Sequence, residues 1–233
     1  MKRSLLFALA AFVFIASCIK DRVPNPNSGN TGGGGGGVVT PPVSTAGDTL
    51  LYYWNFNNVD SAQMLIANWA VNTGYSLVYS GAYYDSVRYG SNVNGVGTDS
   101  IYNSADTTNA ALRLRNPATG PFIMSLPTTG YKNIVLKYAE ARTNKGSATN
   151  VVSYTTDGSN YINTAISAYA TVAIDSVDGT NKYELISFDF STDTSVNNNP
   201  NFKVKIVFSD SSKTLNTSGN DRFDNITLYG AHK

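Results

Sequence analysis

Few side chains in this sequence could serve as the acids, bases or nucleophiles of an enzyme. His232 is the only histidine and lies next to last, and Cys18 is the only cysteine, so neither a Ser-His-Asp nor a Cys-His arrangement has a folded base. Glycosidases need two carboxyl groups about 5 to 9.5 Å apart, and the two glutamates are Glu140 and Glu184. Glu140 is followed two positions later by Arg142 rather than by a second carboxylate. Zinc would need His or Cys clusters. The sequence therefore predicts no enzyme, although the aspartates leave Asp-only chemistry open.

Cys18 has the surroundings of a lipid attachment site. Lys2 and Arg3 precede an uncharged apolar run over residues 5–16, too short to cross a bilayer but typical of a signal-peptide core. The run ends in Ile15-Ala16-Ser17-Cys18, which resembles the lipobox read by lipoprotein signal peptidase. We therefore expect cleavage after residue 17 and a lipid on the thiol. The alternative is an ordinary secretory signal with a chance cysteine, but a lone free thiol would be unusual in an exported protein.

A second group of side chains has the chemistry of a sugar-binding surface. Aromatic rings stack on the apolar faces of pyranose sugars, while Asp, Asn and Arg bind the hydroxyl groups. The candidate ligand-binding residues are Trp69, Tyr83, Tyr84, Asp85, Arg88, Arg113, Arg115, Glu140 and Arg142. Arg113 and Arg115 are expected on one face of a strand. The alternative is that the tyrosines are core or edge residues and that the charged residues form solvated cross-strand pairs.

The composition is typical of an extracellular β-protein rather than a nucleic-acid-binding one. Residues 1–22 hold four basic residues and one acidic residue; without them 13 basic and 15 acidic residues remain, so no nucleic-acid partner is expected. We interpret residues 1–17 as the signal peptide, 18–47 as a flexible Gly/Pro-rich tether, and 48–233 as one domain. Since the only cysteine is used for lipid, this domain must be stabilised by its own hydrophobic core.

From residue 48 onward the hydrophobic period is two, as in β-strands, rather than 3.6. We predict about ten strands, among them residues 50–56, 111–115, 121–126, 132–142, 150–155, 161–162, 183–190, 202–208 and 223–229, with one helical turn near 61–68. Asp157-Gly158 is a tight-turn signal, and the tyrosine-rich segment 79–89 is expected between strands. Many short strands with Asn, Gly and Ser turns predict an antiparallel two-sheet sandwich or barrel.

Four stretches carry a family resemblance. The segment Val135–Arg142 ends in a charged patch with arginine, and residues 151–161 contain Ser-Tyr-Thr-Thr-Asp-Gly-Ser-Asn-Tyr. The first predicted strand of the domain contains Tyr53-Trp54-Asn55-Phe56-Asn57. The last contains Arg222-Phe223-Asp224-Asn225-Ile226-Thr227-Leu228-Tyr229-Gly230, called the closing motif below. This pattern resembles secreted bacterial jelly-roll domains, a group that includes galactose-binding-like domains and carbohydrate-binding modules. The resemblance covers most of residues 48–230 and implies an all-β, antiparallel two-sheet jelly-roll β-sandwich. Because its motifs are structural, it indicates the fold more than the function.

The same resemblance implies a calcium site. In many carbohydrate-binding jelly rolls, an aspartate of the last strand and groups after the first strand hold one structural Ca²⁺. Asp224 is in the matching last-strand position, and Asn57, Asn58 and Asp60 follow the first strand. Hard oxygen ligands of this kind suit Ca²⁺. The alternative is that Asp224 hydrogen-bonds to a neighbouring loop and binds no metal.

Together these patterns predict a non-catalytic, glycan-binding lipoprotein of the outer membrane, exposed at the cell surface or on the periplasmic face. Ile19 follows the cysteine, so the aspartate of an inner-membrane retention signal is absent. The expected partners are the membrane, through the lipid on Cys18, and a polysaccharide or other glycan. Two alternatives stay open: a structural or adhesive surface protein that binds a protein partner and, less favoured, a glycoside hydrolase.

Overall fold

The computed structural model describes residues 48–57, 60–88, 90–96, 109–174, 183–209 and 219–233. The predicted signal peptide, the lipid attachment site at Cys18, the tether over residues 18–47 and the calcium candidate Asn58 lie outside these ranges. None of the helices within them has the length and apolar character needed to cross a membrane.

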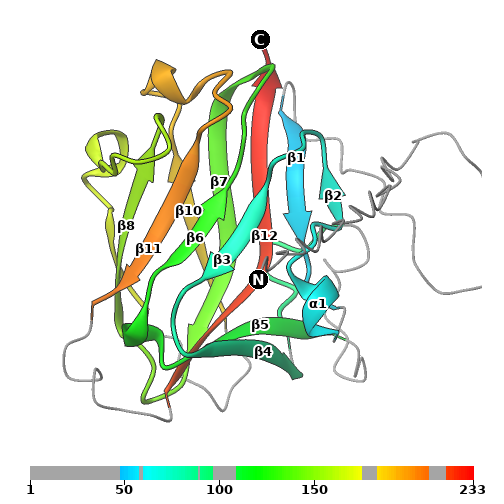
Figure 1. The fold of residues 1–233 in the computed structure, drawn as a ribbon, viewed down its shortest axis with the longest axis vertical. Helices are drawn as coiled ribbons and strands as arrows, with labels where there is room; N and C mark the ends of the chain where they lie inside the picture. Colours follow the sequence, from blue (N-terminus) through cyan, green and yellow to red (C-terminus); the bar gives the residue numbers. More distant parts are fainter. Residues whose placement is uncertain (1–47, 58–59, 89, 97–108, 175–182, 210–218) are drawn as a thin grey trace, which may run out of the picture. The chain divides into compact units, whose positions relative to one another are not determined.

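The strands of the described chain form two antiparallel sheets (Figure 1). The first sheet contains β1 (Thr49–Trp54), β2 (Trp69–Ala70), β4 (Tyr83–Arg88), β5 (Ala110–Arg115), β7 (Tyr131–Arg142), β10 (Glu184–Asp189) and β12 (Asn220–His232). The second contains β3 (Ser76–Tyr79), β6 (Phe122–Ser125), β8 (Thr149–Thr155), β9 (Thr171–Ala173) and β11 (Lys203–Phe208). The helical elements are α1 (Ser61–Met64) and three 3-10 turns, Pro117–Thr119, Thr164–Ile166 and Thr194–Val196.

The chain passes repeatedly from one sheet to the other. The first sheet has the order β10-β7-β12-β1-β2, with β5 pairing β12 and β4 pairing β5, and the second has the order β3-β6-β11-β8-β9. Every connection from β5 to β8 and from β9 to β12 crosses between the sheets. Wrapping of the chain around two facing sheets is the connectivity of a jelly roll. The predicted fold class, an all-β antiparallel jelly-roll β-sandwich, is therefore confirmed.

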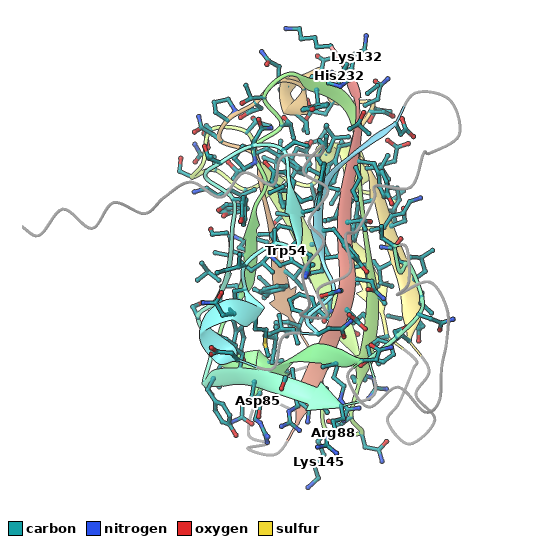
Figure 2. The ribbon with its side chains drawn as sticks, turned by 90° about the vertical axis from the view of Figure 1, so that its right-hand side faces the viewer. Trp54, Asp85, Arg88, Lys132, Lys145 and His232 are labelled. Atoms are coloured by element: carbon teal, nitrogen blue, oxygen red, sulfur yellow. The ribbon has the colours of Figure 1, made fainter. Side chains whose placement is uncertain are left out.

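An aromatic core fills the space between the sheets. Trp54, in the middle of the sandwich (Figure 2), is fully buried there. Its ring stacks on that of Tyr52, with ring centroids 5.9 Å apart. Phe122 of the second sheet meets Phe223 of the first at 5.1 Å. Aromatic side chains bury a large area each, and such ring pairs add to that stabilisation. Because the chain has a single cysteine, no internal disulfide adds to the stability that this core provides.

The strand prediction is confirmed for the long strands and is wrong for the segment that contains candidate ligand-binding residues Tyr83 to Arg88. The tyrosine-rich segment 79–89 is not a connection between strands: Tyr79 ends β3, and Tyr83–Arg88 form β4, an edge strand of the first sheet. Its Tyr-Tyr-Asp-Ser-Val-Arg sequence lacks apolar alternation because β4 covers little of the core. The expected turn at Asp157-Gly158 is confirmed, since Gly158 has a φ of +86° and the Asp157 carboxylate accepts from the backbone N–H groups of Ser159 and Asn160.

Candidate functional site

The outward side of β4, β5 and β12 brings together side chains from three separate parts of the chain. In the strand register Tyr83 lies opposite Arg115, and Asp85 lies opposite Arg113. Arg113 in turn lies opposite Arg222 of β12. The alternate residues of β5, Leu112 and Leu114, belong to the core, so these polar side chains face away from it. We call the group Tyr83, Asp85, Arg113, Arg115 and Arg222 the β4–β5 face; Figure 1 shows β4 and β5 running across one end of the sheet.

Asp85 joins the two arginines of β5. Its Oδ2 lies 2.6 Å from Nη2 of Arg113 and 2.9 Å from Nη2 of Arg115, and its Oδ1 accepts from Nε of Arg113 at 2.7 Å. Partial burial opposes ionisation of Asp85, but the two guanidinium groups outweigh it and hold the pKa of this carboxyl below its usual range. The carboxylate is therefore ionised at neutral pH, and the two arginine heads are held in position by it.

Tyr83 provides an exposed ring beside these charges. The guanidinium carbon of Arg115 lies 5.1 Å from the centre of the Tyr83 ring, a cation–π contact, and 52% of Tyr83 is exposed. Because Arg115 is tied to Asp85, its contact with Tyr83 orients the ring without covering it. An oriented aromatic surface next to fixed hydrogen-bond donors and an acceptor is the set of groups that binds a sugar.

Arg222 is the member of this face that sequence reasoning missed as a ligand-binding residue. It lies in the row formed by Asp85 and Arg113, and its Nε donates to Oδ1 of Asn220 at 3.3 Å. Asp221 and Phe223 on either side of it are fully buried while Arg222 is half-buried, so the strand alternation turns Arg222 away from the core. What the sequence lacked was the pairing of β12 with β5.

Three other ligand-binding candidates from the same region do not join the face. Tyr84 packs against the core, and Arg88 is exposed on the same side of β4 as Tyr84, because successive residues of a strand point to opposite sides. Figure 2 places Arg88 and Asp85 at the same end of the sandwich. Trp69 is on β2, where its indole N–H donates to the carbonyl of Leu50 at 3.0 Å and its ring packs beside Tyr53. Trp69 thus has a packing role.

Glu140 and Arg142 also do not join this face, since both point inward from β7. Glu140 is fully buried, and its Oε1 accepts from Nδ2 of Asn150 on the opposite sheet at 2.6 Å. Arg142 donates through Nε to the carbonyl of Ile174 at 2.6 Å and through Nη1 to that of Thr143 at 3.3 Å. Glu140, expected as a ligand-binding residue, is therefore not accessible from the surface, and Arg142, expected with it, is half-buried and donates to backbone carbonyls. The reason is the strand period, which places even-numbered residues of β7 between the sheets.

The residues expected to hold calcium make hydrogen bonds within the protein. Asp224 accepts the backbone N–H of Ser91 at 2.5 Å through Oδ2 and that of Asn225 at 2.8 Å through Oδ1. Asn57 accepts the backbone N–H of Ala110 at 2.8 Å, and Asp60 is exposed at the start of α1. These contacts match the alternative in which Asp224 secures a neighbouring loop. Calcium at this position stays a prediction.

Asn225, which follows Asp224 in the closing motif, secures the same loop. Its Nδ2 donates to the carbonyls of Ser91 at 2.5 Å and Val93 at 3.1 Å, and its Oδ1 accepts from the hydroxyl of Tyr53 at 2.7 Å. Asn225 is buried and has a φ of +47°, a backbone conformation that asparagine tolerates better than most residues. The Asp-Asn pair of the closing motif is thus structural.

The potential catalytic groups remain apart from the β4–β5 face. His232 is exposed and contacts the ring of Tyr131, at the opposite end of the sandwich from Asp85 (Figure 2). Glu184 lies opposite Glu140 in the register of β10 and β7, but Glu140 has no surface for a substrate to reach. Within the described ranges no three His, Cys, Asp or Glu side chains gather around a common point that could hold a metal ion.

No protein-family model matches this chain, and a search of curated proteins finds no match either. Its structural neighbours include carbohydrate-binding modules. One is a family 61 module solved with β-1,4-galactotriose, with a TM-score of 0.37 and 7% identity over 68% of this chain and 89% of that one. Another is the xylan-binding CBM22-1 domain of Paenibacillus barcinonensis Xyn10C, with a TM-score of 0.40 and 9% identity over 82% of this chain and 99% of that one. A third is a mannan-recognising family 27 module, with a TM-score of 0.36 and 12% identity over 78% and 98% of the two chains. At these TM-scores and identities, what the neighbours bind says nothing of what this chain binds.

Proposed function

We propose that this protein is a non-catalytic glycan-binding lipoprotein and that the β4–β5 face is its binding surface. The observation that supports this proposal is the exposed ring of Tyr83, oriented by Arg115, next to the ionised Asp85. The ring would stack on the apolar face of a pyranose, and the carboxylate and guanidinium groups would bind its hydroxyl groups. Because these groups hold one another in place, little side-chain freedom would be lost on binding.

The lipid anchor completes the proposal. Cys18 would attach the chain to the outer membrane, and the Gly/Pro-rich tether over residues 18–47 would hold the domain away from it. Each buried CH₂ of an acyl chain contributes about 0.8 kcal/mol, so several chains anchor stably where one would not. A glycan-binding domain in this arrangement would collect polysaccharide at the cell surface.

A glycan array followed by titration calorimetry tests the proposal. Tyr83→Ala should weaken binding about 5- to 150-fold, since stacking of this kind contributes on the order of 1–3 kcal/mol by analogy with base stacking on aromatic side chains. Tyr161→Ala is the matched control, because Tyr161 also has a cation over its ring, Lys205 Nζ at 3.8 Å from the ring centre, but lies in the connection that follows β8 of the second sheet. The absence of binding to every glycan, or equal loss in both variants, would contradict the proposal.

A protein partner is the second candidate function, and the outer side of the second sheet favours it. Val207 of β11 lies opposite Val151 of β8, and they are 40% and 36% exposed; Val78 of β3 is 48% exposed. Exposed apolar side chains on a sheet can form an interface. Val207→Lys should abolish capture of a protein partner and leave glycan binding unchanged, whereas capture that survives this change would argue against this surface.

A further inference from the structure

The β4–β5 face carries more positive than negative charge. Its one carboxylate, Asp85, is shared by the guanidinium groups of Arg113 and Arg115, and an arginine stays protonated in proteins. Arg222 lies beside Arg113 in the strand register and is the third arginine of the face. Asp224, two residues further along the same side of β12, is buried, and its two oxygens accept backbone N–H groups of the loop that it secures. The ionised Asp85 and its two arginines therefore keep one positive charge at the surface.

The two arginines of β5 bind Asp85 through the same edge of the guanidinium group. Arg113 donates through Nε at 2.7 Å and Nη2 at 2.6 Å, and Arg115 donates through Nε at 3.3 Å and Nη2 at 2.9 Å. Within the described ranges, no protein group accepts a hydrogen bond from Nη1 of either arginine. Nη1 and the second N–H of Nη2 form a planar fork, which can bind a carboxylate or a tetrahedral anion through two parallel hydrogen bonds. The two side chains are 20% and 31% exposed, so both forks are open to a ligand.

This face offers many hydrogen-bond donors and little acceptor capacity. Oδ2 of Asp85 already accepts three N–H bonds and Oδ1 accepts one. A neutral sugar presents hydroxyl groups, each of which both donates and accepts, whereas a carboxylate or sulfate group only accepts. A group that only accepts leaves no ligand donor without a partner on such a surface. The hydrogen-bonding pattern therefore favours an acidic sugar over a neutral one.

We propose that the glycan bound by the β4–β5 face is acidic, with a carboxylate or sulfate group held by the terminal N–H groups of Arg113 and Arg115. This inference rests on the proposed function and names its ligand class. The pyranose stacks on Tyr83, whose ring centre lies 5.1 Å from the guanidinium carbon of Arg115, so a charged substituent of the same sugar lies beside the forks. An exposed ring next to the charges fits a sugar better than the headgroup of phosphatidylglycerol, which has no apolar ring face to stack on it.

A paired glycan array, probed with the full chain, tests this ligand class. It displays uronate polysaccharides beside their methyl esters and sulfated polysaccharides beside their desulfated forms, so that the members of a pair differ in negative charge. At least one acidic member should bind about 10-fold more tightly than its neutral counterpart, because a hydrogen bond to a charged group contributes more than a neutral one. The preferred pair distinguishes a carboxylate from a sulfate. Raising NaCl from about 0.1 M to about 1 M should weaken binding of the acidic member and leave that of the neutral member unchanged.

Arginine variants locate the anion on the face. Arg113→Gln removes one fork and leaves Arg115 paired with Asp85, so calorimetry should show about 10-fold weaker binding of the acidic glycan and unchanged binding of the neutral one. Arg113→Lys keeps the charge without the fork and should give a smaller loss. Arg88→Gln is the matched control, because it removes the same charge from the opposite side of β4, the strand of Asp85, and it should keep the full affinity.

The outcomes separate this inference from the proposed function. Equal binding of the acidic and neutral members of every pair would overturn the acidic ligand while glycan binding itself stands. An equal loss in Arg113→Gln and Arg88→Gln would also overturn it, as would binding to phosphatidylglycerol vesicles but to no acidic glycan. Binding to no glycan at all, acidic or neutral, would contradict the proposed function and this inference with it.

Discussion

Replacing Asp85 by asparagine removes the one negative charge that joins Arg113 to Arg115 on the β4–β5 face. The two ion pairs measure 2.6 and 2.9 Å, and the side chains are between 20% and 33% exposed. Exposed pairs contribute about 0.2–1 kcal/mol each, so the loss of both pairs in Asp85→Asn should cost about 0.4–2 kcal/mol, although pairs that share a carboxylate are not strictly additive. For a domain of this size, that lowers the Tm by roughly 1–8 °C.

The stabilisation from Asp85 must depend on pH and salt in a defined direction. Because the pKa of Asp85 is lowered in the folded state, its contribution is present above the unfolded pKa of about 3.9 and is lost as the pH falls through the folded pKa. The Tm difference between wild type and Asp85→Asn should therefore be full at pH 7 and shrink below about pH 3.9. It should also shrink in 1 M NaCl, where the Debye length falls to about 3 Å.

Differential scanning calorimetry at several pH values and salt concentrations measures this difference. Asp189→Asn is the control, because Asp189 is exposed on β10 and its carboxylate accepts one backbone N–H, that of Ser191 at 2.8 Å. A Tm loss in Asp85→Asn no larger than in this control would refute the reasoning. So would a difference that stays constant from pH 7 to the acid range and in high salt.

Three further predictions concern the core, the closing motif and the anchor. Trp54→Ala empties a fully buried site and should lower the free energy of unfolding by about 3–5 kcal/mol in urea; a loss below about 1 kcal/mol would show that the core is misassigned. Asn225→Ala should cost about 2–4 kcal/mol in the same assay, because the hydroxyl of Tyr53 and two loop carbonyls lose their partner. Cys18→Ala should abolish labelling with radioactive palmitate and move the protein from the membrane to the soluble fraction, and labelling that persists would exclude this cysteine as the anchor.

The long strands were predictable because each buries one side in the core, so its sequence alternates visibly. Residues 132–142 and 202–208 were predicted as strands, and the structure has β7 and β11 there. Short edge strands bury little and carry no such signal, which is why Tyr83–Arg88 was expected to connect strands and proved to be β4. The same limitation affected the candidate site, since its exposed tyrosine is on that strand.

The sequence by itself determined the residue types and the single cysteine, because both are read directly from it. It also determined the alternation within each long strand, because that alternation depends only on positions that are neighbours in the chain. It therefore predicted that Arg113 and Arg115 share a side of β5. Which strands pair, and in what register, was decided by the packing of two sheets around one core. That packing placed Asp85 against both arginines and put Glu140 between the sheets opposite Asn150, because a one-residue difference in strand position moves a side chain from surface to interior.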